Sequence, residues 1–189
     1  MPPVIDQIGR AIDMTAAIVD GITDDRLTEP TPSGEWDVRT ELNHLVGGMR
    51  IFAAELTGTD AGGDHESDWL GADPRGAYAE AAVLDRAAWS RPGALQSTVH
   101  LSFGAVPGPK AAVIHLTEVL VHGLDLAVAT GQEKLADEPM SEELLEIMLG
   151  MDFDVFRRPG MFGPAVPAPA GAPAHRRLLA FLGRELPAA

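Results

Sequence analysis

The chain has 189 residues, of which 46% are hydrophobic and 22% charged, so it is long enough for one globular domain with a sizeable core. The formal net charge is −14 at pH 7, and a field of that sign disfavours binding to nucleic acids and to anionic membrane surfaces. Cysteine is absent, which excludes disulfides, cysteine nucleophiles and thiolate metal sites within the chain.

Two segments bear on localisation. The N-terminal sequence MPPVIDQIGRAIDMT has no basic start followed by an apolar core, so it does not read as a secretory signal. The longest apolar segment, 111–129, contains several ionisable side chains, which makes it a poor membrane span. The sequence therefore predicts a soluble, cytoplasmic protein.

The first half of the chain predicts three helices. Apolar residues at helical spacing predict the first helix at 4–21. The second begins after Asp37, a residue type that caps helix N-termini, and ends at Gly58. A loop rich in glycine and aspartate should precede a third helix at 75–90.

The second half adds a small β element and two more helices. Residues 97–108 alternate and are rich in β-branched and aromatic side chains, which predicts a short strand or hairpin. A fourth helix is expected at 109–130, ended by Gly131. The fifth helix should begin at Pro139 or Ser141.

The C-terminal part differs in composition from the rest. Residues 157–174 are rich in proline and glycine and should be extended, and 175–186 predict a short final helix. The pattern predicts a mainly α fold, a four-helix bundle with one short β element. We expect a single domain, with the bundle at about 4–157 and the tail with its final helix at 158–189.

The fourth predicted helix carries a narrow polar stripe in apolar surroundings. His115, Glu118, His122 and Asp125 fall within about 80° of one another at 100° per residue. Burying such groups costs several kcal/mol each unless they are paired or bound to something. Histidine and carboxylates without lysine or arginine are the chemistry of a metal site.

Glu118 and His122 are the central pair of this stripe. They stand one helical turn apart, so both can reach a single ion. A catalytic zinc usually has three protein ligands and one open position, so a third ligand is needed from another helix. The alternative is that the two side chains form only a helix ion pair beside solvent.

Four histidines are candidates for the third ligand. His65 lies in an acidic loop and is expected to be solvated, His100 lies half-buried in the predicted strand, and His115 is two turns before His122. His44 points about 140° from the centre of its helix's apolar face, which is typical of a surface histidine. The two glycines at 47–48 argue the other way, because they leave room for another element or a ligand to approach.

Three segments resemble a known family. GEWDVRTELNHLVGG and HLTEVLVHGLDLAVATGQ are similar to the DinB-like metal-binding four-helix bundles, in the branch of the mycothiol-dependent maleylpyruvate isomerase N-terminal domain. The ending FGPAVPAPAGAPAHRRLLAFLGRE resembles the tail of an uncharacterised actinobacterial subgroup of that branch.

The resemblance implies a divalent metal, zinc first and nickel second, held by a histidine on the second helix and a Glu-x-x-x-His pair on a later one. These ligands match His44, Glu118 and His122. Asp125 would then lie either behind the ligands or in the pocket, since a ligating histidine usually needs a hydrogen-bond acceptor on its other nitrogen. His115 is left as either a pocket-lining or a structural histidine.

The resemblance also implies an external thiol, mycothiol, as cosubstrate. The function expected is a metal-dependent S-transferase that joins this small-molecule thiol to an unknown electrophile. Maleylpyruvate isomerisation itself is disfavoured, because the isomerase has a sizeable C-terminal domain that this sequence lacks. The alternatives are a non-catalytic metal-binding or ligand-sensing bundle and a structural protein with a satisfied polar network. A homodimer is left open.

Overall fold

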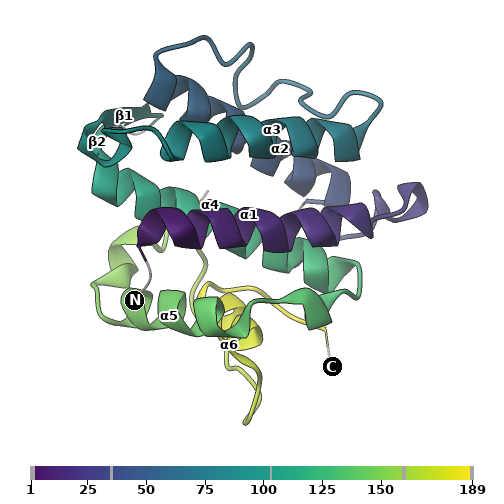
Figure 1. The fold of residues 1–189 in the computed structure, drawn as a ribbon. Coiled ribbons are helices and arrows are strands. Elements are labelled where there is room, and N and C mark those ends of the chain that lie inside the picture. Colours follow the sequence, from purple (N-terminus) through teal and green to yellow (C-terminus); the bar gives the residue numbers. More distant parts are fainter. Residues whose placement is uncertain (1–2, 35, 103, 159–160, 188–189) are drawn as a thin grey trace.

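The computed structural model describes residues 3–34, 36–102, 104–158 and 161–187. These residues form a mainly helical fold with one small antiparallel sheet (Figure 1). The helices are α1 (Val4–Asp20), α2 (Val38–Thr57), α3 (Pro74–Trp89), α4 (Gly108–Ala129), α5 (Glu138–Leu149) and α6 (Ala174–Phe181), and the strands are β1 (Thr98–Leu101) and β2 (Gly104–Pro107).

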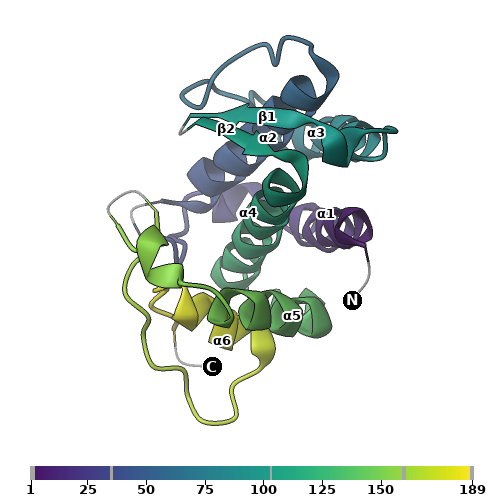
Figure 2. The ribbon, with the colours of Figure 1, turned by 90° about the vertical axis from the view of Figure 1, so that its left-hand side faces the viewer.

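The first four helices form the bundle. α1 packs along α4 and α3, and α2 packs along α3 and α4. Figure 2 shows this arrangement, with α1 beside α4 and the pair α2 and α3 lying across them. The prediction of a mainly α, bundle-like fold is confirmed.

α4 is the central helix of the core. Fifteen of its 22 residues are buried, among them Leu116, Leu120 and Leu124. By length and composition it is also apolar enough to cross a membrane, but 72% of its apolar 18-residue stretch is buried inside the protein. A helix enclosed by three others buries its apolar side chains against protein, so this hydropathy is that of a core helix.

The helix boundaries follow local capping chemistry. The Asp37 side chain accepts a hydrogen bond from the Thr40 amide at the start of α2, and Gly58 ends that helix with a φ of 69°, as predicted. α5 begins earlier than Ser141 because Asp137 caps it, with Pro139 in its first turn. The last helix is shorter than predicted, and Gly183 follows its end with a φ of 87°.

The chain after the bundle folds back beside it. α5 packs against α6, and the proline-rich stretch between them runs as a long loop around this pair (Figure 2). The Arg157 guanidinium donates to the Phe181 carbonyl oxygen, and the Val166 amide donates to the Ala180 carbonyl oxygen. Residues 157–158, 161–164 and Arg184 thereby line the same cavity as α4.

Candidate metal centre

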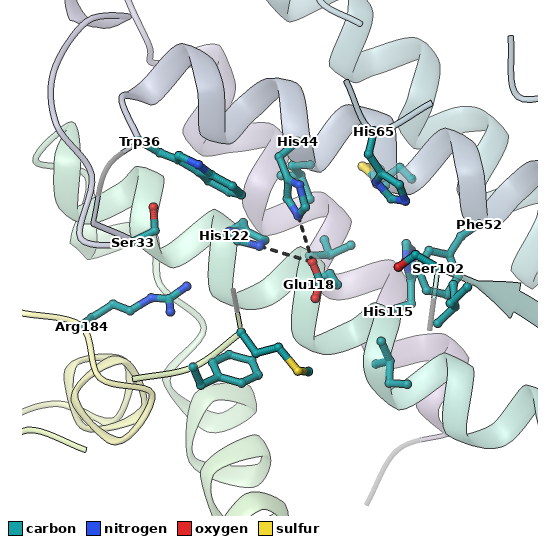
Figure 3. Close-up of a pocket in the computed structure, with 18 of the residues that line it drawn as sticks. Ser33, Trp36, His44, Phe52, His65, Ser102, His115, Glu118, His122 and Arg184 are labelled. Atoms are coloured by element: carbon teal, nitrogen blue, oxygen red, sulfur yellow. Dashed lines mark hydrogen bonds and ion pairs between the residues drawn. The ribbon is translucent and has the colours of Figure 1, made fainter. Parts of the chain in front are cut away.

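A cavity of about 1090 Å³ lies between the bundle and the returning C-terminal segment. Its walls come from α2, α4, the end of the hairpin, the loops that carry Trp36 and His65, and the C-terminal residues 157–158, 161–164 and Arg184. This volume is slightly above the usual range for small-molecule sites, which is about 300–1,000 Å³. Figure 3 shows side chains from these separate elements pointing towards the same space.

Three of the predicted ligands meet in this cavity. The Nε2 atoms of His44 and His122 each lie 3.3 Å from Oε2 of Glu118 (Figure 3). One ligand atom from each residue lies within 4.8 Å of the other two. The side chains of His44, Glu118 and His122 are 31%, 37% and 11% exposed, so the cluster is open to the cavity on one side.

His44 is not the surface histidine that its helical position predicts. α2 has neighbours on two sides, α3 along one and α4 along the other. His44 faces the second side, where its ring packs edge-on against His122 with ring centroids 4.9 Å apart. Gly48 has open space where a side chain would stand, and it lines the cavity beside His44.

Glu41 holds His122 from behind, which the sequence analysis did not foresee. Its Oε1 lies 2.7 Å from His122 Nδ1, and its Oε2 accepts a hydrogen bond from the Ser33 hydroxyl at 2.9 Å. The Glu41 side chain is fully buried. Asp125, which was expected behind the ligands or in the pocket, does not make this bond. The available signal was that Glu41 lies three residues before His44, on the same side of α2.

Charge and hydrogen bonding set the protonation of this cluster. Burial alone would lower the pKa of His122, but its hydrogen bonds to Glu118 and Glu41 outweigh burial and raise that pKa to about 10. Burial alone would raise the pKa of Glu118 and of Glu41. The bonds to His122, with His44 also acting on Glu118, lower both pKa values instead.

Trp36 covers the two histidines. Its ring centroid lies 4.8 Å from that of His44 and 5.9 Å from that of His122, and the second pair is stacked. Trp36 precedes the capping residue Asp37, so the cap of α2 also positions this indole over the ligands. The arrangement shields one side of the cluster from solvent.

Asp125 bonds to the C-terminal segment instead of to His122. Its Oδ2 accepts hydrogen bonds from Nε and Nη2 of Arg184 at 3.2 and 3.0 Å. Burial and the nearby charge of Glu41 raise the pKa of Asp125 to about 7, although Arg184 and His122 act against this. Arg184 lies outside the motifs that the sequence analysis used for the site.

The other candidate histidines take different places. His115 is buried, its Nε2 lies 2.7 Å from Asp85 Oδ2, and its ring packs against Phe52 and Trp89. It also borders the cavity, so it is both structural and pocket-lining. His65 is exposed at the cavity rim. His100 is not half-buried as predicted, since its side chain is 69% exposed beside Glu55.

Comparison with known proteins gives the family. Residues 8–127 match the model of the mycothiol maleylpyruvate isomerase N-terminal domain. The chain belongs to this family. The matched range contains His44, Glu41, Glu118 and His122, and it ends before Arg184. The family assignment predicted from the three sequence segments is therefore confirmed.

Two uncharacterized proteins of Mycobacterium tuberculosis, from strain CDC 1551 / Oshkosh and strain ATCC 25618 / H37Rv, are similar to this family member along nearly its whole length. Each is 35% identical over 181 residues, which covers 94% of this chain and 95% of theirs. The C-terminal segment is therefore shared with these relatives as well as the bundle.

A solved structure is also similar to this chain. It is the crystal structure of the mycothiol-dependent maleylpyruvate isomerase, with 13% sequence identity and a TM-score of 0.48. The match covers 66% of this chain and 60% of that one, so the chain spans about three fifths of the isomerase's length.

Proposed function

We propose that this family member binds one divalent metal ion, zinc by preference, through His44, Glu118 and His122. We further propose that it is a metal-dependent S-transferase that uses mycothiol or a similar low-molecular-weight thiol. The observation that carries the proposal is the spacing of the three ligand atoms. Both histidine Nε2 atoms lie 3.3 Å from the same Glu118 oxygen.

This spacing fits the coordination geometry of zinc. Ligand atoms about 2.0–2.1 Å from an ion, at tetrahedral angles, lie about 3.3 Å from one another. The donor set of two imidazoles and one carboxylate is that of catalytic zinc sites, which keep a fourth position open. The exposed side of the cluster faces the cavity, where an open position would have to be.

The charges around the cluster also fit a divalent ion. Glu41, Glu118 and Asp125 carry three negative charges when all are ionised, and Arg184 with one divalent cation would balance these charges with both histidines neutral. The raised pKa of Asp125, about 7, shows that its negative charge is unfavourable without such a cation. Without the cation, the pKa of His122 is raised because its imidazolium must serve as the countercharge.

The residues have separable roles in this proposal. A divalent ion at the site supplies Lewis acidity, which lowers the pKa of a thiol that takes its open position. Glu41 orients the His122 ring and makes its other nitrogen a more basic metal ligand. Trp36 lines the cavity and lies against both histidine rings, so it keeps water from that side of the cluster. The chain has no cysteine, so the reacting sulfur must come from a bound cosubstrate.

The cavity has room for a thiol together with an electrophile. At about 1090 Å³ it exceeds the usual volume for one drug-sized ligand. The family to which the chain belongs is that of the mycothiol maleylpyruvate isomerase N-terminal domain, which supports mycothiol as the first thiol to test. A non-catalytic metal-binding or ligand-sensing protein is the second candidate, because the same three ligands serve binding without turnover.

The test is metal analysis of the purified protein followed by thiol-consumption assays with a panel of electrophiles. We expect about one zinc per chain, and mycothiol consumption that disappears with the ion in His122→Ala, because three protein ligands are the usual minimum. His65→Ala is the matched control, since His65 lines the same cavity outside the cluster. Wild-type metal content in His122→Ala would refute the ligand set, and metal without any turnover would favour the second candidate.

A further inference from the structure

Two groups of ligand atoms overlap at His122. The first is the cluster of His44, Glu118 and His122, and the second is formed by Glu41, His122 and Asp125. In each group, one ligand atom from each residue lies within 4.8 Å of the others. The described side chains therefore offer a divalent ion two neighbouring binding positions, and His122 is a possible ligand in both.

The second group also has three possible ligands, the number that a catalytic zinc site usually takes from the protein. It has one imidazole and two carboxylates, and Glu41 and Asp125 are both fully buried. Oδ1 of Asp125 has no hydrogen-bond partner among the described residues, although it is buried. A buried carboxylate oxygen without a partner is costly, and a cation is the usual compensation.

Arg184 lines the cavity and forms an ion pair with one member of this second group, Asp125. Its guanidinium makes two hydrogen bonds to Asp125 Oδ2, at 3.2 and 3.0 Å, and its side chain is 9% exposed. Figure 3 shows it on the side of Ser33 and His122, away from His115 and Ser102. An arginine keeps its charge at every pH that a protein tolerates, so this cation is permanent.

We propose that Arg184 confines the metal ion to His44, Glu118 and His122 by occupying the second group. An ion held by Glu41, His122 and Asp125 would share Asp125 with a fixed positive charge in a buried setting, where like charges repel strongly. Removing that charge should open the second place. The inference rests on the metal centre proposed above, and it gives the C-terminal segment a role in selecting the ligands.

Cobalt binding tests the inference, because the visible spectrum of Co²⁺ reports its ligand geometry independently of turnover. His44→Ala should weaken Co²⁺ binding strongly. Adding Arg184→Met should restore affinity by at least about 10-fold, the size of effect that groups behind a ligand commonly have. The restored complex should show an altered spectrum, and a third change, Asp125→Asn, should abolish the restoration.

Two controls separate this effect from a general loosening of the segment. Arg184→Lys keeps the charge and should not restore binding to His44→Ala. Arg158→Met removes another arginine that lines the cavity from the same segment, and it should not restore binding either. Circular dichroism checks that each variant is folded, with Arg184→Gln replacing Arg184→Met if the latter is not.

The outcomes distinguish the two proposals. Folded His44→Ala/Arg184→Met that binds Co²⁺ no better than His44→Ala overturns the role of Arg184 and leaves the metal centre standing. The single variant Arg184→Met gives a second readout, since a Co²⁺ spectrum identical to the wild type also overturns the role. A wild-type protein that binds no Co²⁺ refutes the metal centre itself.

Discussion

At the scale of single residues, Glu41 is the buried side chain that holds His122 of the cluster in place. It is fully buried and lies 2.7 Å from His122 Nδ1. We expect Glu41→Gln to weaken zinc affinity by about 10- to 100-fold, because it removes the charged acceptor that orients the ring. Competition with a zinc chelator measures this.

Glu55→Gln is the matched control for that measurement. Glu55 is on the same helix and also accepts from a histidine, but that histidine is the exposed His100. Its substitution should leave the zinc affinity unchanged. Equal affinities for Glu41→Gln and the wild type would show that the bond to His122 does not support the site.

The raised pKa of His122 also predicts how many protons the protein releases when it binds a metal ion. Its raised pKa of about 10 means that the metal-free protein carries an imidazolium there at pH 7. A ligating histidine must be neutral, so zinc binding at pH 7 should release about one proton from His122. Calorimetry in buffers with different ionisation enthalpies measures the release. Binding heats that do not depend on the buffer would contradict the raised pKa.

The same pKa sets how the stability of the metal-free protein depends on pH. Because the folded pKa lies above the ordinary value of 6.5, His122 contributes its full stability below about pH 6.5. That contribution is lost as the pH rises through about 10.

At the scale of elements, the proposed metal centre would join α2 to α4. His44 is on α2, and Glu118 and His122 are on α4, so a bound ion would cross-link two helices of the bundle. A ligand at 100 times its Kd adds about 2.7 kcal/mol to the free energy of unfolding. For a chain of this size, chelation should therefore lower Tm by about 5–10 °C.

His44→Ala provides the control for the chelation experiment. It removes the only cluster ligand on α2, so chelator should not change its melting curve further. If the wild-type curve is also unchanged after verified metal removal, the ion does not stabilise the contact between these helices.

The limits and faces of the helices also show which features the sequence alone can predict. Capping residues and glycines predicted the limits of α2 and the end of α4, because those signals are local. Helical periodicity also placed Glu118 and His122 on one face. Periodicity misplaced His44, because a helix with neighbours on two sides buries polar as well as apolar positions. Only the family resemblance selected His44.

At the scale of the whole molecule, the cavity depends on contacts between distant parts of the chain. The proline-rich stretch predicted only an extended tail, yet residues 157–158, 161–164 and Arg184 form one wall of the cavity. The bond between Arg184 and Asp125 spans 59 positions in the sequence. No local signal indicates such a contact, which explains why the sequence placed Glu118 and His122 on one helix face but did not predict the cavity wall beside them.

The whole-molecule charge supports a small-molecule role. With a net charge of −14, the chain draws metal cations towards itself and repels polyanions. Within the cavity, by contrast, Arg157, Arg158 and Arg184 bring positive charge close to the cluster.

X-ray absorption at the zinc edge of the purified protein tests the central claim most directly. We expect two imidazole nitrogens and carboxylate oxygen at about 2.0–2.1 Å. No sulfur ligand should be present until a thiol is added, when one sulfur at about 2.3 Å should appear. His44→Ala should lose the zinc signal. A zinc-loaded protein whose spectrum lacks imidazole scattering, or one that is unchanged in His44→Ala, would contradict the assignment of His44, Glu118 and His122 as the metal ligands.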